Sequence, residues 1–356
     1  MAKILVGLSG GVDSAFCAAY LKNQGHEVTG ITMSIWGDKK IQHHKTTHGA
    51  CLGPDEKEDI ENAKKTAEFL KIPYYVVDCS KKYDEIVLQN FKNEYLSGKT
   101  PNPCVWCNSL IKFKALPQMA KETGIEFDKF ATGHYARILN QNGIYKLLRA
   151  KDYKKDQSYF LYKLTQEQLK DIILPLGEMT KLEVRKGAQK FGLEVFNKPD
   201  SQDFFEGDYN ELLDVAPKIG NIINEKGEIL AQHQGIWNYT IGQRKGLGIS
   251  SKEPLYVIKL DKETNTVVVG NINSTFKKSL TATNINYPSG KIKNGNYKAK
   301  IRSNQIPQNC KIEIGENEIK VDFEEYQKSI ALGQSVVIYE DDIVVAGGII
   351  SKVFDI

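Results

Sequence analysis

The sequence contains no long apolar run. None approaches the roughly 20 consecutive apolar residues that a membrane-spanning helix needs. The first residues, MAKILVGLSGG, carry a single lysine and a short apolar stretch that ends in glycine and serine, which is typical of a strand entering a loop and not of a secretory signal. We therefore expect no membrane partner and a cytoplasmic location, where thiols stay reduced.

The sequence also has little excess charge of either sign. Lys and Arg number 48 against 44 Asp and Glu, a net charge of +4, which indicates a polyanionic partner only weakly. The distribution is more informative, because the segment 291–302, KIKNGNYKAKIR, contains five basic residues and no acidic residue. The segment 240–248, TIGQRKGLG, adds two more basic residues. Ordinary solvated loops explain both segments equally well at this point.

Cysteine is scarce, with six residues in the whole chain. In a reducing compartment such cysteines are expected to be buried, metal-binding or catalytic and not disulfide-bonded. Cys104 and Cys107 stand close together in the stretch 100–108, TPNPCVWCN, which suits a metal clip, a redox couple, a catalytic thiol with a helper or two inert neighbours. The others are Cys17, Cys51, Cys79 and Cys310.

Strands and helices alternate in the first part of the chain. Apolar runs predict strands at 4–8, 28–35, 74–79 and 128–134. Helical periodicity covers about 13–23, 55–70, 82–96 and 110–122. This alternation predicts an α/β fold with a doubly wound parallel sheet, in which ligands bind at the carboxyl ends of the strands.

The pattern changes after about residue 200. Helical periodicity largely stops, and short β-rich segments follow at 229–235, 255–261, 266–270, 298–302, 311–315 and 335–350. In the last of these, EDD predicts the turn of a hairpin. We expect an α/β domain at 1–200, a small central domain at 201–276 and a C-terminal β-barrel domain at 277–356.

A glycine-rich loop, GLSGGVDS at 7–14, follows the first predicted strand and opens a helix. Gly10 and Gly11 allow a tight turn and a close approach to a ligand, and the helix N–H groups with the Ser9 and Ser14 hydroxyls can surround an anion. It is not a Walker A loop, because the GK[ST] ending is absent. The SGGVDS motif resembles the pyrophosphate loop of the ATP pyrophosphatases, which cleave ATP to AMP and pyrophosphate with Mg²⁺.

Further motifs narrow the resemblance. TPNPCVWCN at 100–108, TGHYAR at 132–137, KDQSYFLY at 155–162, TIGQRKGLG at 240–248 and VVAGGII at 344–350 occur in order. Over nearly the whole chain they resemble the bacterial tRNA-specific 2-thiouridylases of the MnmA type. The resemblance implies an N-terminal adenylation domain, a small central domain and a C-terminal β-barrel. It also implies ATP-dependent adenylation of the C2 oxygen of wobble uridine 34, followed by replacement with sulfur.

The resemblance carries over residue by residue. It implies an ATP site formed by Gly7, Leu8, Ser9, Gly10, Gly11, Val12, Asp13, Ser14, Met33 and Gly133. It implies contacts to the tRNA anticodon stem-loop by Asn102, Pro103, His134, Lys155, Asp156, Gln157 and Gln334. The target base must leave its stack to reach such a site. Gln157 has a donor and an acceptor suited to a uracil edge, and Asp13 is expected to bind Mg²⁺ or to hold the loop.

The chain departs from the family at the sulfur-handling residues. The usual form has one cysteine in a PNPDxxCN motif, matched here by Cys107, and a persulfide cysteine in DSxxICF. Aligning DSQDFFEGD at 200–208 with the second motif puts Phe205 at the persulfide cysteine, and Cys104 replaces the aspartate of the first. The standard two-cysteine route therefore cannot operate here.

Three alternatives follow for the thiols. In the first, Cys104, Cys107 and a third cysteine hold a 4Fe–4S cluster that leaves one iron open. Cys51, in a glycine-flanked loop, is the preferred third ligand, and Cys79 is the second choice. Alternatively, Cys104 and Cys107 form a persulfide that is resolved as a disulfide. Zinc, with His43, His44 or His48 nearby, is the remaining option.

The function itself has two competing hypotheses. A different ATP pyrophosphatase acting on a small substrate would not need the basic β domains or the PNPC motif. A non-catalytic tRNA-binding relative would not need an intact SGGVDS loop. We therefore predict an ATP-dependent tRNA-uridine 2-sulfurtransferase with Cys107 and Cys104 as catalytic residues, supplied by sulfide or by a sulfur-relay protein.

Overall fold

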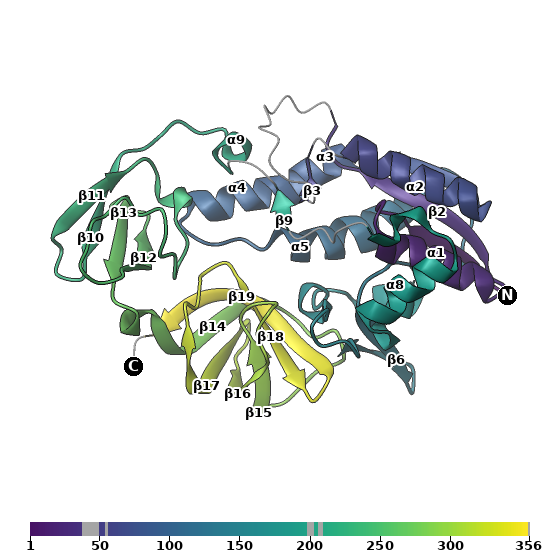
Figure 1. Cartoon of the computed structure of the whole chain (residues 1–356). Helices are drawn as coiled ribbons and strands as arrows, with labels where there is room; N and C mark the ends of the chain where they lie inside the picture. The colour runs from purple at the N-terminus through teal and green to yellow at the C-terminus, as the bar shows by residue number, and fades with distance from the viewer. Residues whose placement is uncertain (38–49, 54–55, 198–202, 206–208, 355–356) are drawn as a thin grey trace.

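The computed structural model describes residues 1–37, 50–53, 56–197, 203–205 and 209–354. Three bodies are visible: an N-terminal α/β body, a small β body and a β-barrel (Figure 1). The histidines proposed as alternative zinc ligands, at 43, 44 and 48, lie outside the described residues. No helix in the described ranges is long and apolar enough to cross a membrane.

The N-terminal body is built on a parallel sheet, as predicted. Five strands are arranged in the order β4-β2-β1-β5-β8. Their bounds are β1 Lys3–Gly7, β2 Glu27–Ser34, β4 Tyr74–Asp78, β5 Lys129–Ala131 and β8 Ile172–Ile173. The central strand is apolar from Ile4 to Val6, because both of its faces are covered there. Ile4 and Val6 belong to one core cluster and Leu5 to another.

Helices supply those two faces. Cys17, Ala18 and Leu21 of α1 and Ala63 and Ala67 of α2 pack against one face, while the second cluster includes side chains of α4, α5 and the following helix. The helices with their bounds are α1 Val12–Asn23, α2 Glu56–Leu70, α3 Ser80–Tyr83, η1 Asp84–Leu88, α4 Gln89–Leu96, α5 Pro103–Trp106, η2 Cys107–Ala115, α6 Leu116–Glu122, η3 Ser158–Phe160, α7 Gln166–Asp171, η4 Pro175–Glu178, α8 Lys181–Lys190, η5 Glu194–Asn197 and α9 Tyr209–Leu213. The doubly wound arrangement is therefore confirmed.

One helix boundary was predicted wrongly. Helical periodicity indicated a helix from about Leu110, but helical backbone already begins at Pro103. Proline is favoured at the first position of a helix, where its missing N–H has no partner to lose. From Cys107 the helix widens to π geometry as far as Ala115. Both cysteines therefore lie on the first turns of one continuous helix and not in a loop.

A hairpin inside the first 200 residues was not predicted. Strands β6 (Ala136–Gln141) and β7 (Ile144–Arg149) pair with each other, and Leu148 of β7 pairs with Ile343 of the barrel strand β19. The hairpin therefore extends the C-terminal sheet, whose order is β14-β17-β16-β15-β18-β19-β7-β6. This pairing connects the N-terminal body to the barrel.

The two β bodies follow the predicted change of pattern. The central sheet has the order β11-β10-β13-β12, and an additional β14–β19 pairing closes the barrel. The bounds are β10 Gly220–Asn224, β11 Ile229–His233, η6 Ile236–Asn238, β12 Tyr256–Asp261, β13 Thr266–Gly270, η7 Asn273–Thr275, β14 Phe276–Asn286, β15 Gly295–Lys300, β16 Gln308–Ile314, β17 Glu318–Lys328, β18 Ser335–Glu340 and β19 Ile343–Phe354. Glu340 pairs with Ile343, so the EDD hairpin is confirmed.

Candidate active site

The loop at 7–14 connects β1 to α1 at the carboxyl edge of the parallel sheet. Gly10 has φ of +71°, and a Cβ there would lie 2.4 Å from the carbonyl oxygen of Asp59. Only glycine fits this combination of left-handed backbone and close approach. Gly11 is the N-cap of α1 and has no side chain to cap it, so the first N–H groups of the helix remain available to an anion.

Two serines shape the same loop. The Ser14 hydroxyl accepts from the Ser9 backbone N–H at 3.0 Å and donates to the Gly11 carbonyl at 3.1 Å. The two hydroxyls are 3.1 Å apart. Ser14 therefore holds the loop closed over the start of α1, and Ser9 is the more exposed of the two hydroxyls.

The other predicted ATP residues lie at the same sheet edge. A Cβ on Gly133 would lie 2.7 Å from the Asp13 carbonyl carbon and 2.8 Å from the Ser14 nitrogen, so the 132–134 segment packs directly on the loop. Met33 is the penultimate residue of β2, and the Leu8 N–H donates to the neighbouring Ile31 carbonyl at 2.8 Å. The structure thus brings together the segments that the sequence assigned to ATP.

Asp13 is held by two partners that sequence reasoning missed. The Tyr135 hydroxyl donates to its Oδ1 at 2.8 Å, and Lys181 Nζ lies 2.7 Å from Oδ1 and 2.8 Å from Oδ2. Lys181 is the first residue of α8, where Thr180 and Glu183 form a capping box. That box is readable in the sequence as TKLE, but nothing in the sequence indicates which loop the lysine reaches.

Cys104 and Cys107 are both half-buried on the helix that follows Asn102. The pKa of the Cys79 thiol is raised to about 11, chiefly by burial and to a lesser extent by the charges of Asp78 and Cys107. Cys79 therefore lies within range of an electrostatic interaction with Cys107. Burial also raises the pKa of Cys17 and of Cys310, the latter to about 12, which fits inert core cysteines.

A lysine lies beside this pair of cysteines. Lys163 Nζ lies 4.5 Å from the centroid of the Trp106 ring. Trp106 stands between the two cysteines in the sequence. It also donates to Asn284 Oδ1 of the barrel at 2.9 Å. Burial lowers the pKa of Lys163 to about 8. A desolvated amine therefore contacts the helix turn that carries both thiols.

Phe205 occupies a hydrophobic position. It is 3% exposed, and its ring centroid lies 6.2 Å from that of Tyr209. Its strand β9 (Asp203–Phe205) pairs in parallel with β3 (Ala50–Leu52), with Leu52 opposite Phe205. The strand that carries Cys51 thus runs beside the strand that carries Phe205. Among the described residues, no group of three His, Cys, Asp or Glu side chains is close enough to hold a metal ion.

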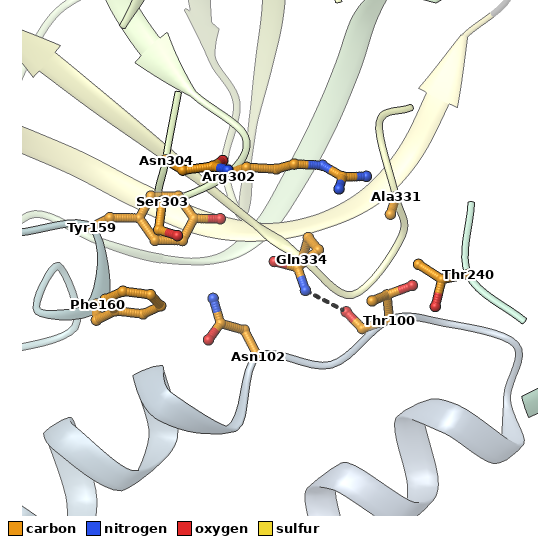
Figure 2. A pocket seen from close by; sticks show the side chains of 10 residues that line it. All are labelled: Thr100, Asn102, Tyr159, Phe160, Thr240, Arg302, Ser303, Asn304, Ala331 and Gln334. Atoms are coloured by element: carbon orange, nitrogen blue, oxygen red, sulfur yellow. Dashed lines mark hydrogen bonds between the residues drawn. The ribbon is translucent and has the colours of Figure 1, made fainter. Parts of the chain in front are cut away.

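A polar cavity of about 330 Å³ lies between the N-terminal body and the barrel (Figure 2). Gln334 Nε2 donates to the Thr100 carbonyl at 3.3 Å and to the Pro101 carbonyl at 3.1 Å, which fixes the segment before α5 against the barrel. The lining residues are Thr100, Asn102, Tyr159, Phe160, Thr240, Arg302, Ser303, Asn304, Ala331 and Gln334. Of the predicted tRNA contacts, Asn102 and Gln334 meet here.

The 155–157 segment is held in place by its own side chains. Asp156 is buried, with a side chain 1% exposed, and accepts from the Ala150 and Ser158 backbone N–H groups, both at 3.1 Å. Its Oδ2 also lies 3.6 Å from Lys300 Nζ. Gln157 Oε1 accepts from the Tyr135 N–H at 2.9 Å. Asp156 therefore anchors this segment. The Tyr135 N–H occupies the acceptor oxygen of the Gln157 side chain.

His134 is a neutral histidine at this site. Burial lowers its pKa well below the ordinary value of 6.5, and the charge of Lys112 lowers it further. Its Nδ1 lies 2.8 Å from Thr132 Oγ1, and its ring centroid lies 5.4 Å from that of Phe113. The neutral ring can therefore form a hydrogen bond with the Thr132 hydroxyl without carrying a charge.

This neutral state predicts a pH dependence of stability. Because the folded-state pKa of His134 is depressed, the unfolded chain binds the proton first, and stability falls as the pH drops below about 6.5. His134→Asn should reduce the loss of unfolding free energy between about pH 7.5 and about pH 5.5, measured by urea unfolding. His233→Asn should reduce the loss in the same direction, because burial also lowers the pKa of His233. An unchanged pH dependence in His134→Asn would contradict this assignment.

Family models match all three bodies. Residues 2–205 match the tRNA methyl transferase HUP domain, 212–271 the tRNA methyl transferase PRC-barrel domain and 277–350 the aminomethyltransferase beta-barrel domain. The last two matches correspond to the central sheet and the closed barrel described above. The fold expected from the sequence is thereby confirmed.

Relatives of known name match over the full length. The chain is 51% identical over 356 residues to the tRNA-specific 2-thiouridylase MnmA of Endomicrobium trichonymphae, with 98% of each chain covered. It is 45% identical to the protein of that name from Rickettsia typhi, with 99% of each chain covered. Among solved structures, NMN synthetase from Francisella tularensis matches at 17% identity and a TM-score of 0.34, covering 59% of this chain and 71% of that one, a likeness too weak to add anything. The family model and the full-length relatives show that this chain belongs to the tRNA-specific 2-thiouridylases of the MnmA type.

Proposed function

We propose that this chain uses ATP to replace the C2 oxygen of wobble uridine 34 in certain tRNAs with sulfur, giving 2-thiouridine. The observation that carries the proposal is the SGGVDS loop, in which Gly10 is sterically required and on which Gly133 packs closely, in a chain with full-length 2-thiouridylase relatives. ATP-dependent tRNA thiolation is the activity of that family. The assignment of individual residues below is part of the proposal.

The loop at 7–14, with Met33 and Gly133, binds ATP. Uncapped N–H groups at the start of α1 and the Ser9 hydroxyl receive the phosphates that leave as pyrophosphate. In the adenylation step, the uridine O2 forms a bond to the α-phosphorus, and the bond from that phosphorus to the β-phosphate oxygen breaks. The Asp13 carboxylate is an oxygen ligand of the kind that Mg²⁺ prefers, so the donor set fits that ion. Mg²⁺ would neutralise charge on the leaving pyrophosphate.

The cavity between the two bodies receives the flipped base. Phe160 supplies an aromatic face for stacking, and Asn102 supplies an amide donor and acceptor for a base edge (Figure 2). Arg302 adds a positive charge at the opposite wall, where its Nη2 donates to the Ser329 carbonyl at 3.1 Å. Gln334, Gln157 and Lys155 support the surrounding anticodon stem-loop. Asp156 acts by holding the 155–157 segment in position.

Cys107 and Cys104 carry the sulfur chemistry. Phe205 is buried in an aromatic cluster, so the position of the usual persulfide cysteine offers no thiol. Two thiols on one helix fit two of the three ligands of a cluster that keeps one iron open. Such a 4Fe–4S cluster would supply a sulfide-binding position beside the activated carbon. The alternative is a persulfide on one cysteine, whose outer sulfur is transferred from the persulfide of a sulfur-relay protein. The other thiol then attacks the inner sulfur, the outer sulfur leaves at the sulfide level and displaces AMP from the activated carbon, and an external thiol reduces the resulting disulfide of Cys104 and Cys107.

Two cysteines compete for the third ligand. The β3–β9 pairing places the backbone of Cys51 one strand away from the position where relatives of the usual type carry their persulfide cysteine. The glycine-flanked segment around Cys51 therefore runs close to that position, which supports Cys51. Cys79 is the second candidate, because its thiol lies within electrostatic range of Cys107.

The direct test is thiolation of an anticodon stem-loop transcript. Anaerobically purified protein with ATP, Mg²⁺ and sulfide should convert uridine 34 to 2-thiouridine, detected by mass spectrometry of the digested nucleosides. A transcript with cytidine at position 34 is the matched control and should gain no sulfur. If the uridine transcript stays unthiolated and no AMP forms, the proposed function is wrong.

A further inference from the structure

Residues 7–14 contain one acidic side chain, Asp13, and no basic one. A loop that receives the phosphates of ATP needs positive charge from elsewhere, because backbone N–H groups supply only partial charges. Lys181, from helix α8, supplies a full charge at this loop through its contacts with both oxygens of Asp13. Its side chain is only 11% exposed, so its position is well determined by packing.

Local structure delivers this lysine to the loop. The capping box of Thr180 and Glu183 starts α8 at Lys181, and the Lys181 N–H donates to Asp152 Oδ2 at 3.0 Å. Gly187 allows α8 to approach α1, since a Cβ there would lie 2.3 Å from Phe16 Cε2. A cation at the first position of a helix opposes the helix dipole, which disfavours it. The placement is therefore unfavourable for α8 alone and is compensated at Asp13.

We propose that Lys181 is a phosphate-binding residue of the ATP site. In the nucleotide-free protein Asp13 holds the Lys181 ammonium group at the loop, and in the ATP complex that group contacts the phosphates that leave as pyrophosphate. Lysine is suited to this as a mobile point charge on a flexible stem. Coordination of Mg²⁺ by an Asp13 oxygen would weaken the ion pair and release the lysine toward the phosphates. The inference rests on the proposed function, because it places ATP at residues 7–14.

An ordinary structural role is the competing explanation. Lys181 could simply fasten α8 to α1 through Asp13, as the Tyr135 hydroxyl fastens the 132–135 segment to the same carboxylate at 2.8 Å. The two explanations differ in which nucleotide they affect. A fastening residue affects every nucleotide that the loop binds, whereas a ligand of the leaving phosphates affects ATP and leaves AMP almost unchanged.

The experiment compares the dissociation constants of a non-hydrolysable ATP analogue and of AMP, with Mg²⁺, by calorimetry. Lys181→Met should weaken the ATP analogue by about 10- to 100-fold, the loss expected for a hydrogen bond to a charged group, and AMP by less than about threefold. Lys181→Arg should recover part of the affinity, because it restores the charge. Tyr135→Phe removes the other bond to Asp13 and keeps the charge, so it should affect both nucleotides alike. Lys190→Met, an exposed lysine at the end of the same helix, should change neither.

The outcomes separate this inference from the proposed function. Equal losses for the ATP analogue and AMP in Lys181→Met, or no loss for either, would overturn the inference while wild-type thiolation stands. Wild-type protein that binds no ATP analogue and thiolates no transcript would overturn both. Unfolding midpoints are measured for each variant. If Lys181→Met is not folded, Lys181→Gln, which keeps a donor to Asp13 without the charge, takes its place with the same expected outcomes.

Discussion

Cys107→Ala is expected to reduce tRNA thiolation by at least about 1,000-fold, because it removes a group on which every proposed sulfur route depends. ATP consumption should persist in this variant, since the proposed ATP site, formed by the loop at 7–14 and Gly133, contains no thiol. Thiolated nucleoside is quantified by mass spectrometry and AMP by chromatography, in the same anaerobic reaction. Cys310→Ala is the matched control, because Cys310 is buried in the barrel core. Thiolation that survives in Cys107→Ala would contradict the assignment.

The companion cysteine variants distinguish the routes. If a cluster operates, Cys104→Ala and Cys107→Ala should each lose both bound iron and thiolation, and one of Cys51→Ala and Cys79→Ala should do the same. If a persulfide operates, wild-type protein stripped of iron by a chelator should keep its activity when a protein persulfide is the sulfur donor and a thiol reductant is present. Cys79 is buried and its pKa is raised, so the effect of Cys79→Ala is interpreted together with an unfolding measurement. Full activity in an iron-free preparation would rule out the cluster.

The sequence predicted the fold well where burial sets the pattern. Val6 and its neighbours in β1 are buried on both faces, so the strand appears as a continuous apolar run. The β6–β7 hairpin was missed for the opposite reason. Leu139 and Ile144 are exposed apolar residues in that hairpin, and its place is decided by pairing with β19 far along the chain. Such a long-range pairing leaves no local signal.

The candidate site divides in the same way. The role of Gly10 in a tight turn was predictable, because the motif places glycine between a strand and the start of a helix. Lys181 was not, because its contact with Asp13 spans 168 residues and depends on how closely α8 packs on α1. The helical start at Pro103 was missed as well, because the TPNP run is typical of a turn. Local chemistry is therefore readable from the sequence, whereas the partners that hold it in place are set by tertiary packing.

Gly10→Ala is expected to abolish ATP binding and to lower the unfolding free energy by about 2–4 kcal/mol. An alanine there would need the left-handed backbone of φ +71° and would place its Cβ 2.4 Å from the Asp59 carbonyl oxygen and 2.9 Å from its Cα. Those atoms belong to the backbone of α2, so they cannot rotate away as a side chain would. Either the loop or α2 must move, and the N–H groups at the start of α1 then lose the arrangement that surrounds the phosphates.

Gly11→Ala in the same loop is the matched control for this effect. Gly11 has an ordinary φ of −100°, and a Cβ there meets only the Ser9 hydroxyl at 3.6 Å, a normal contact. It should therefore fold with nearly wild-type stability. Its Cβ also tests how closely the phosphates approach the loop: a loss of ATP affinity at unchanged stability places the ligand against Gly11. Calorimetry with the ATP analogue and urea unfolding separate the two effects, and a stable Gly10→Ala variant that binds ATP normally would contradict the loop geometry.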